Sequence, residues 1–407
     1  MSARETVAVV GAGLAAAHAV EALRASGYDG HLVLYGAEPH HPYERPPLSK
    51  GYLLGNDERD AAFPHPAAWY DERDVDLRLT TTVTALDLDR HEVLTGDHRQ
   101  RFDRLLLCTG AMPRRLAMAD RSGAPVAYLR TLEDCERLRD ALRPGTRLVI
   151  VGAGWIGLEV AAAARAADCT VTVVETLDLP LLRVLGPEVA QVFAALHRAH
   201  GVDLRLATGV GGIVRDGELA DVHLTDGSTL LADLVLVAVG AAPGTALAEA
   251  AGLDVDDGVV VDARLRTSNP DVLAAGDVAR AFHPLLGRHL RVEHWDNAIG
   301  QGAVAGRNLG GADDEYDRLP YFFTDQYDLG MEYVGAVGPE GYDEVVLRGD
   351  VPGRVFTAFW LREGRVLAGM HVNDWDAIDP VRAIVARGAP DVARLRDESV
   401  PLTDLTG

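Results

Sequence analysis

The chain has 407 residues, a formal net charge of −22 and 48% hydrophobic residues. A chain of this length exceeds the size at which one hydrophobic core keeps growing, so two or three domains are expected. The acidic charge argues against non-specific binding of nucleic acid, because phosphate contacts need Lys and Arg. The sequence also lacks an uncharged apolar run of roughly 18 residues that could span a membrane, and its 42 glycines favour an α/β fold with many tight turns.

The N-terminal residues and the cysteines indicate the compartment. The apolar run Val7–Val10 begins almost at once, without the basic start and small-residue cleavage site of a secretory signal. The three cysteines, Cys108, Cys135 and Cys169, form no CxxC pair. They are therefore interpreted as reduced, buried small residues, and no metal site is predicted. We expect the protein to act in the cytoplasm.

The first motif in chain order is a strand, a glycine turn and an Ala-rich helix. It comprises Val7–Val10, Gly11, Gly13, Ala16, a helical run over 17–25 and a second β-rich run over His31–Tyr35. In such a motif the first Gly permits the bend, the second lets the backbone approach a pyrophosphate, and the third position lets the helix pack close to the strand. The helix N-terminus adds free N–H groups and a partial positive charge. Glu38, just beyond the second strand, is the candidate for a ribose contact.

The same motif recurs far along the chain. The second copy comprises Leu148–Val151, Gly152, Gly154, Gly157, a helical run over 158–167 and a strand over Thr170–Val174. Glu175 follows Gly154 by about 20 residues, the spacing at which an acid takes the ribose hydroxyls. A carboxylate there accepts from a free 2′-OH and repels a 2′-phosphate, so NADH is expected in preference to NADPH. Two dinucleotide sites in one chain point to a resident FAD and an exchanging NAD.

Three further apolar runs end in small-residue turns. Those over 105–107 and 234–237 could each close one nucleotide domain and lead into the other. The third, over 273–275, ends in Gly276-Asp277. An aspartate at the carboxyl end of a strand can hold a ribityl hydroxyl, which makes Asp277 a candidate FAD contact.

Four further motifs carry a family resemblance that covers nearly the whole chain. They are Pro42–Lys50 (PYERPPLSK), Thr267–Ala279 (TSNPDVLAAGDVA), Phe323–Tyr327 (FTDQY) and Asp397–Leu402 (DESVPL). With these motifs the chain resembles the bacterial FAD-dependent NADH–ferredoxin reductases of the putidaredoxin-reductase type, which have a glutathione-reductase-like fold. Such reductases serve cytochrome P450 and ring-hydroxylating dioxygenase systems. The resemblance implies that electrons pass from NADH through FAD to a small acidic iron–sulfur protein.

The resemblance also implies roles for individual residues. The FAD contacts that it implies are Gly11, Gly13, Leu14, Ala15, Glu38, Arg45, Lys50, Val83 through its backbone, Arg130, Asp277, Glu293, His294, Trp295 and Phe323. The NAD contacts that it implies are Gly152, Gly154, Ile156, Gly157, Glu175, Arg183 and Gly240. Lys50 is expected near flavin N5 and paired with Glu159, and these two are the catalytic candidates. The pairing is physically sensible, because a buried charge needs a partner and a cation near the flavin stabilises negative charge on the ring. The alternative interpretation is a simple interdomain salt bridge.

Two departures from the family pattern concern the flavin surroundings. The usual Pro-Trp-Phe-Trp is Pro320-Tyr-Phe-Phe323 here, so both tryptophans are replaced by other aromatic residues. The usual Glu-Ser-Trp is Glu293-His294-Trp295. His294 could be a pH-sensitive flavin contact, but a packing histidine is the favoured interpretation.

The absence of a cysteine pair constrains the route of the electrons. Disulfide reductases of this fold carry two cysteines in the first helix after the glycine turn, and this chain has no cysteine before Cys108. A relay to a dithiol is therefore excluded, and electrons must leave from the flavin itself. That favours single-electron delivery to a ferredoxin. Arg382 and Arg387 are the candidate docking residues for it.

The expected fold is α/β, with two Rossmann-like dinucleotide-binding domains and a C-terminal α+β domain. Residues 1–112 and 241–316 are expected to form the FAD domain, 113–240 the NAD domain, and 317–407 the C-terminal domain. The last of these contains strand-like runs over 344–347, 355–360 and 366–371.

Two other functions stay open on the sequence. One is an NADH oxidase or peroxidase that reduces oxygen or other acceptors directly. Peroxidases of this fold need a catalytic cysteine near residue 42, where this chain has Pro42. The other is a redox-responsive binding protein similar to apoptosis-inducing factor. No contact with nucleic acid or a membrane is expected.

Overall fold

The computed structural model describes residues 5–388 and 391–406, which fall into two compact units. The first unit contains the described residues up to Arg45, Glu58–Met112 and Ala241–Arg318. The second contains Pro46–Asp57, Pro113–Gly240 and the described residues from Leu319 onward. The division into three functional domains stays a prediction.

The first unit is built on a parallel five-stranded sheet of order β19-β7-β1-β2-β3. Its strands are β1 (Thr6–Val10), β2 (His31–Tyr35), β3 (Val75–Arg78), β7 (Arg104–Leu107) and β19 (Val272–Ala274). In β1 and β2 every residue after the first is buried. Near-continuous apolar strands of this kind are typical of a parallel sheet covered on both faces.

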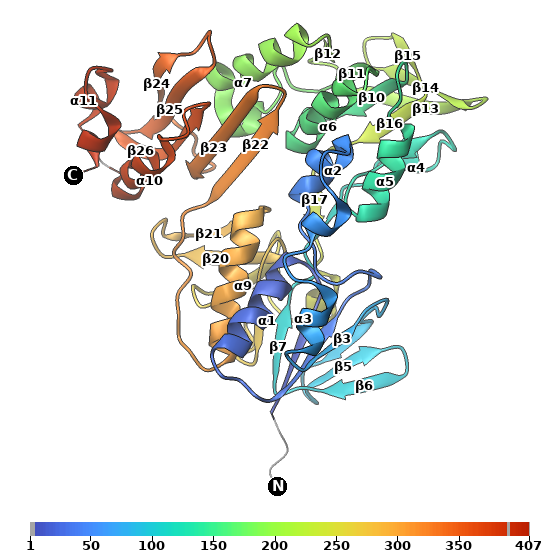
Figure 1. Cartoon of the computed structure of the whole chain (residues 1–407), viewed down its shortest axis with the longest axis vertical. Helices are drawn as coiled ribbons and strands as arrows, with labels where there is room; N and C mark the ends of the chain where they lie inside the picture. The colour runs from blue at the N-terminus through green and yellow to red at the C-terminus, as the bar shows by residue number, and fades with distance from the viewer. Residues whose placement is uncertain (1–4, 389–390, 407) are drawn as a thin grey trace. The chain divides into compact units, whose positions relative to one another are not determined.

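Helix α1 (Leu14–Ala25) packs along α9 (Trp295–Leu309) in the first unit (Figure 1). The close approach depends on two glycines of α9. A Cβ on Gly302 would lie 2.3 Å from the Ala15 carbonyl oxygen, and one on Gly306 would lie 2.2 Å from that of Ala19. Helix α1 begins at Leu14, three residues earlier than the helical run predicted over 17–25, because the extended residue Gly13 leads directly into the first helical turn.

The remaining elements of the first unit are small. They are α3 (Ala67–Asp71), η2 (Arg59–Ala62), α8 (Ala246–Ala250), an antiparallel sheet of β4 (Ala85–Asp87), β5 (Glu92–Thr95) and β6 (His98–Arg101), and a sheet of β18 (Val259–Val261), β20 (Ala279–His283) and β21 (Arg288–Arg291). Two of the places where the chain passes between the units lie within β8 (Ala111–Pro113) and just before β17 (Ala241–Pro243).

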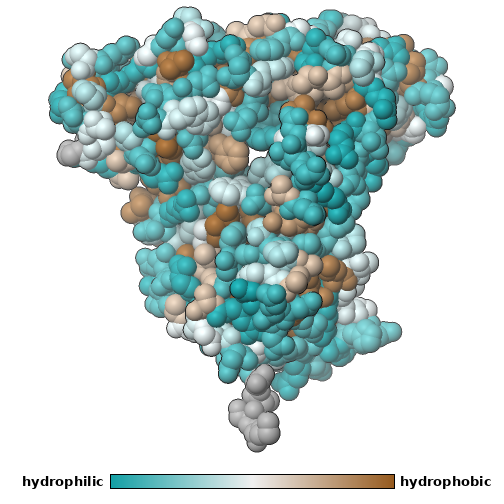
Figure 2. Space-filling model, in the orientation of Figure 1, coloured by the Kyte–Doolittle hydropathy of each residue, from teal (hydrophilic) through white to brown (hydrophobic). Residues whose placement is uncertain are grey.

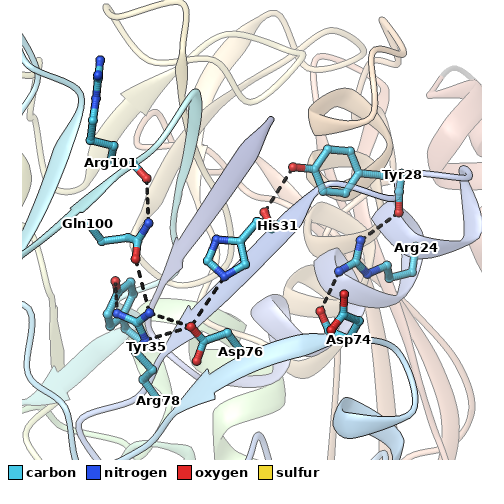
Figure 3. Close-up of polar contacts among 9 residues, drawn as sticks. All are labelled: Arg24, Tyr28, His31, Tyr35, Asp74, Asp76, Arg78, Gln100 and Arg101. Carbon is cyan, nitrogen blue, oxygen red and sulfur yellow. Dashed lines mark hydrogen bonds and ion pairs between the residues drawn. The ribbon is translucent and has the colours of Figure 1, made fainter. Parts of the chain in front are cut away.

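Polar side chains fix the β3 edge of the parallel sheet (Figure 3). Arg24 of α1 donates from Nη2 to the Asp74 carbonyl oxygen at 2.8 Å, just before β3. On β3, Asp76 accepts from Arg78 Nε at 3.0 Å and lies 3.6 Å from His31 Nε2 of β2. These contacts tie the helix that follows the first glycine turn to the edge strand.

The second unit contains another parallel sheet, of order β12-β11-β10-β16-β9. Its elements are β9 (Val126–Ala127), β10 (Arg147–Val151), α6 (Trp155–Ala166), β11 (Thr170–Val174), α7 (Leu182–Ala199), β12 (Asp203–Arg205) and β16 (Leu234–Val237). Beside it lie η1 (Pro46–Ser49), α2 (Gly51–Leu54), α4 (Ala117–Asp120), α5 (Leu132–Ala141) and the antiparallel strands β13 (Val210–Asp216), β14 (Leu219–Leu224) and β15 (Thr229–Ala232). Both predicted strand–turn–helix motifs are therefore present.

The C-terminal residues of the second unit form an antiparallel sheet of order β22-β23-β26-β25-β24 with helices. The elements are β22 (Tyr321–Gln326), β23 (Leu329–Gly335), β24 (Glu344–Asp350), β25 (Val355–Arg362), β26 (Arg365–Val372), α10 (Ile378–Arg387), α11 (Val392–Arg396) and η3 (Leu402–Leu405). The sheet has five strands where three were predicted. Sequence reasoning missed the strands β22 and β23. In β22 the buried positions are held by the polar residues Thr324 and Gln326, so this strand lacks a simple apolar pattern.

Hydrophilic residues cover most of the face shown in Figure 2, and apolar residues appear there as scattered patches. Among the described residues, no helix combines the length and apolar character needed to cross a membrane.

Candidate functional site

The first glycine turn joins β1 to α1 and leaves the N-terminus of α1 uncapped. Gly11 has φ +103°, and a Cβ there would lie 2.1 Å from the Cys108 carbonyl oxygen, so the bend requires glycine. Gly13 is the N-cap residue, with no side-chain cap and no acid in the first turn of the helix. A Cβ on Gly13 would meet no protein atom within 4 Å. The turn thus offers open space and free N–H groups, which fit the pyrophosphate of a dinucleotide.

Glu38 and Arg45 come together beyond β2 in the first unit. Arg45 Nη2 donates to Glu38 Oε1 at 3.0 Å, and the Tyr43 hydroxyl donates to Glu38 Oε2 at 2.5 Å. Burial disfavours the charge of Arg45, but Tyr43 and Glu38 outweigh it and raise the pKa of the guanidinium. Both predicted residues are therefore held in one polar cluster. The structure adds Tyr43, a residue of the Pro42–Lys50 motif for which no role was predicted.

Asp277 stands where β19 gives way to a glycine turn. Gly276, with φ +80°, directs its N–H to Gln301 Oε1 at 2.9 Å, and a Cβ on Gly276 would lie 2.9 Å from Ala15 Cβ. The turn that carries Asp277 therefore lies against the start of α1. Leu14 and Ala15 are themselves buried at that start. The predicted FAD residues at these positions thus share one end of the parallel sheet.

The Glu293-His294-Trp295 segment leads into α9. Glu293 is exposed and pairs with Arg291. His294 is the N-cap residue, and its Nδ1 accepts from the Asp296 N–H at 3.2 Å, while Trp295 is the first helical residue. His294 therefore has a structural task as a helix cap. Elsewhere in this unit, Val83 is buried in the core beside the same sheet.

The second glycine turn joins β10 to α6 and repeats the first in detail. Gly152 has φ +104°, and a Cβ there would lie 2.4 Å from the Ala238 carbonyl oxygen. Gly154 is an uncapped N-cap residue with open space at its Cβ position. Gly157 packs so closely that a Cβ would lie 2.3 Å from the Gly152 carbonyl oxygen. Ile156 is 46% exposed, although it is a large apolar residue next to this turn. These features fit a second dinucleotide.

Glu175 follows β11 and faces the second turn. Its Oε2 accepts from the Ala153 N–H at 2.8 Å, and its Oε1 accepts from the Leu177 N–H at 3.0 Å. The carboxylate is thus fixed beside the glycine turn, where the ribose of a bound dinucleotide is expected.

Three other predicted residues lie apart from the turns in sequence. Arg130 is half-buried just before the N-cap residue of α5, and its N–H donates to Asp134 Oδ2 at 3.1 Å. Gly240 is exposed, with φ +98°. Arg183 is exposed in the first turn of α7.

Lys50 and Glu159 form an ion pair in the second unit. Lys50 Nζ lies 2.5 Å from Glu159 Oε1, and the side chains are 17% and 6% exposed. Lys50 Nζ also lies 5.4 Å from the centre of the Phe323 ring. The predicted pairing of the two residues is present in the structure, while their role in the chemistry stays a prediction.

Four residues without a predicted role complete the surroundings of Glu159. They are Ser49, Thr324, Gln326 and His197. The Ser49 hydroxyl donates to Glu159 Oε2 at 2.5 Å, and the Thr324 hydroxyl donates to Glu159 Oε1 at 2.7 Å. The Phe323–Tyr327 motif could have indicated two of these residues from the sequence. Thr324 and Gln326 stand on either side of an acid in a strand, so their side chains share its buried face.

His197 gives the second unit a specific response to acid. Burial lowers its pKa from 6.5 to about 4. Between those values the unfolded chain binds a proton at this residue that the folded chain does not, so the free energy of unfolding falls as the pH drops from 6.5 towards 4. The contribution, present in full above pH 6.5, amounts to up to about 3 kcal/mol. Denaturant unfolding should therefore be less pH-dependent in His197→Gln than in the parent, whereas the half-buried neighbour variant His200→Gln should follow the parent. Equal pH dependence in all three proteins would contradict this.

The three cysteines are buried and unpaired. Burial raises the pKa of Cys135 to about 12, and it also raises the pKa values of Cys108 and Cys169. Thiolates are the reactive form, so these residues are poor nucleophiles and poor redox partners.

Comparison with known proteins identifies the family. The family described as pyridine nucleotide-disulphide oxidoreductase matches residues 5–302, and the reductase C-terminal family matches 321–406. The chain is 42% identical to the ferredoxin–NAD(+) reductase component of the anthranilate 1,2-dioxygenase system of Burkholderia cepacia, over 97% of each chain. It is 39% identical to putidaredoxin reductase of Pseudomonas putida, over 100% of this chain and 97% of that one.

The solved structures agree with the sequence relatives. The structure of the covalent putidaredoxin reductase–putidaredoxin complex matches with a TM-score of 0.95 and 38% identity, over 99% of this chain and 98% of that one. The predicted fold class is thereby confirmed. The chain belongs to the pyridine nucleotide-disulphide oxidoreductase family, with a reductase C-terminal region.

Proposed function

We propose that this protein is an FAD-dependent reductase that takes electrons from NADH and delivers them to a small acidic iron–sulfur ferredoxin serving a cytochrome P450 or a dioxygenase. The observation that carries the proposal is a pair of uncapped glycine turns in one chain whose three cysteines are all buried and unpaired. The relatives named as reductase components of dioxygenase systems, and putidaredoxin reductase itself, support it.

The proposal assigns each glycine turn to one cofactor. FAD, when bound, accepts a hydride and returns electrons singly. The proposed FAD contacts are Gly11, Gly13, Leu14, Ala15, Glu38, Arg45, Lys50, Val83, Arg130, Asp277, Glu293, His294, Trp295 and Phe323. The proposed NAD contacts are Gly152, Gly154, Ile156, Gly157, Glu175, Arg183 and Gly240. Residues 1–112 and 241–316, 113–240, and 317–407 are the proposed FAD, NAD and C-terminal domains.

Lys50 and Glu159 have different tasks in this proposal. The Lys50 ammonium stabilises negative charge on the isoalloxazine ring when the ring is reduced, and Glu159 holds the ammonium in place. Neither side chain has to move a proton, because hydride transfer mainly requires the two rings to stack at reacting distance.

The proposed preference for NADH depends on Glu175. Glu175→Ala removes both the acceptor for a ribose hydroxyl and the charge that repels a 2′-phosphate, so the ratio of kcat/KM for NADH to that for NADPH should fall by about tenfold or more. Asp178→Ala, at an exposed acid three residues further along the chain, is the matched control. Steady-state kinetics with both nucleotides checks this. An unchanged ratio in Glu175→Ala would show that the preference has another origin.

The proposed activity is tested by ferredoxin-dependent turnover. FAD-loaded protein with NADH should reduce cytochrome c rapidly only when a [2Fe–2S] ferredoxin is added. Rapid oxygen consumption without ferredoxin would indicate an NADH oxidase, and slow turnover with a long-lived charge-transfer complex would indicate a redox-responsive binding protein.

Arg387 is exposed, whereas Arg382 is half-buried over the Tyr321 ring, so Arg387 is the better docking candidate. A cytoplasmic location is part of the same proposal.

A further inference from the structure

Glu159 is the end point of a chain of hydrogen bonds within the second unit. Gln326 Nε2 lies 3.1 Å from Thr324 Oγ1, and His197 Nε2 lies 2.8 Å from Gln326 Oε1. Thr324 and His197 are fully buried, and Gln326 is 1% exposed. A buried polar chain of this length is costly unless every member is satisfied, so its presence needs an explanation.

The direction of the donors follows from the carboxylate. An ionised Glu159 can only accept, so the Thr324 hydroxyl must donate to it. The Thr324 oxygen then accepts from the Gln326 amide nitrogen. This turns the Gln326 carbonyl oxygen towards His197, whose Nε2 must therefore carry the proton. Every donor in the chain points towards Glu159.

His197 is suited to the outer end of this chain. It lies in the last turn of α7, and its Nδ1 faces the Tyr327 hydroxyl at 3.4 Å. The ring stays neutral at ordinary pH, which fixes one tautomer and with it the orientation of Gln326. Because His197 resists protonation and the Gln326 amide does not relay protons, the chain is not suited to conduct protons. It is suited to hold the Glu159 side chain rigidly.

Lys50 is the only lysine in the chain, and all other residues in the Lys+Arg total of 39 are arginines. Arginine forms most ion pairs here, for example with Glu38 and with Asp233. The cation that pairs with the carboxylate at the end of the buried chain is instead this lysine. A compact ammonium carries its charge at a single atom, whereas a guanidinium is a wider, planar fork. The direction of the ammonium then depends on the direction of its carboxylate.

We propose that Thr324, Gln326 and His197 are positioning residues that aim the Glu159 carboxylate at Lys50. Thr324 acts directly on the carboxylate, and Gln326 and His197 fix the Thr324 hydroxyl. The value of this arrangement rests on the proposed function, in which the Lys50 ammonium must stay at the isoalloxazine ring.

The single lysine makes the test selective. When the protein is expressed with lysine labelled with ¹³C and ¹⁵N, its NMR spectrum contains one Nζ signal, that of Lys50. This signal can be detected through the attached Cε even if the ammonium protons exchange quickly. In the full-length protein, Thr324→Val should shift this signal and shorten the hydrogen-exchange lifetime of the ammonium by about tenfold or more, since a hydrogen bond to the charged partner is lost. Gln326→Met should have the same effect to a smaller extent.

Two controls separate positioning from general damage. Thr324→Ser restores the hydroxyl and should restore the parental signal. Thr357→Val makes the same chemical change at another buried threonine of the second unit and should leave the signal alone. If Thr324→Val and Gln326→Met behave like Thr357→Val, the proposal is overturned.

A second measurement separates this proposal from the proposed function. In Thr324→Val the midpoint potential of bound FAD should become more negative, because the cation is held less firmly. A changed Lys50 signal with an unchanged potential would uphold the positioning network and remove Lys50 from the flavin.

Discussion

Gly13→Ala is expected to give a folded protein that does not retain FAD. Gly13 has an extended backbone that alanine adopts freely, and its new methyl group would meet no protein atom within 4 Å. The only thing that the methyl group displaces is the ligand proposed to lie there. The affinity for FAD should fall by about 100-fold or more, while the midpoint of unfolding measured without added FAD stays close to the parent's. Flavin absorbance after purification and a titration with FAD would measure this.

The second turn supplies the matched control. Gly154→Ala makes the same change in the same geometry, so it should leave the protein yellow and weaken only the binding of NADH. Gly11→Ala differs from both, because its Cβ would lie 2.1 Å from a carbonyl oxygen at positive φ and should disrupt the fold of the first unit. A Gly13→Ala protein that binds FAD as tightly as the parent would remove the first turn from the cofactor site.

Lys50→Met should slow reduction of FAD by NADH by about 100-fold, the loss expected when one preorganised charge is removed from a reacting centre. It should also lower stability by about 3 kcal/mol, because Glu159 is left as a buried carboxylate without a counter-charge. Rapid mixing of the protein with NADH measures the first effect, and denaturant unfolding measures the second.

The double variant Lys50→Met/Glu159→Gln separates these two effects. It removes the unpaired charge, so stability should return towards the parent's, while reduction should remain slow. Recovery of the rate together with stability would mean that the pair is only a structural salt bridge, which is the alternative that the sequence left open.

The sequence predicted what depends on local pattern. Short-range geometry accounts for the bends at Gly11 and Gly152, which have positive φ, and for the acid that follows each second strand. The parallel pairing of β1 with β2 and of β10 with β11 confirms the two predicted strand–turn–helix–strand motifs. The Lys50–Glu159 pair spans a large separation in the chain and could be named only through resemblance to a family.

The network behind Glu159 could not be predicted in this way. It joins His197 on a helix to Thr324 and Gln326 on a strand, and no spacing rule connects them. The strand itself was missed because its buried face is polar, which hides the usual alternation of apolar and polar residues. Likewise, the role of His294 as the cap of α9 depends on where the helix begins.

In the most direct measurement, NADH-reduced protein is mixed anaerobically with an oxidised ferredoxin, and the flavin absorbance is followed in a rapid-mixing spectrometer. The flavin absorbance should return as the ferredoxin is reduced. Each NADH should supply electrons to two one-electron acceptors, and thiol reagents should not affect the rate. Flavin that remains bleached in the presence of ferredoxin, yet recovers when oxygen is admitted, would contradict it.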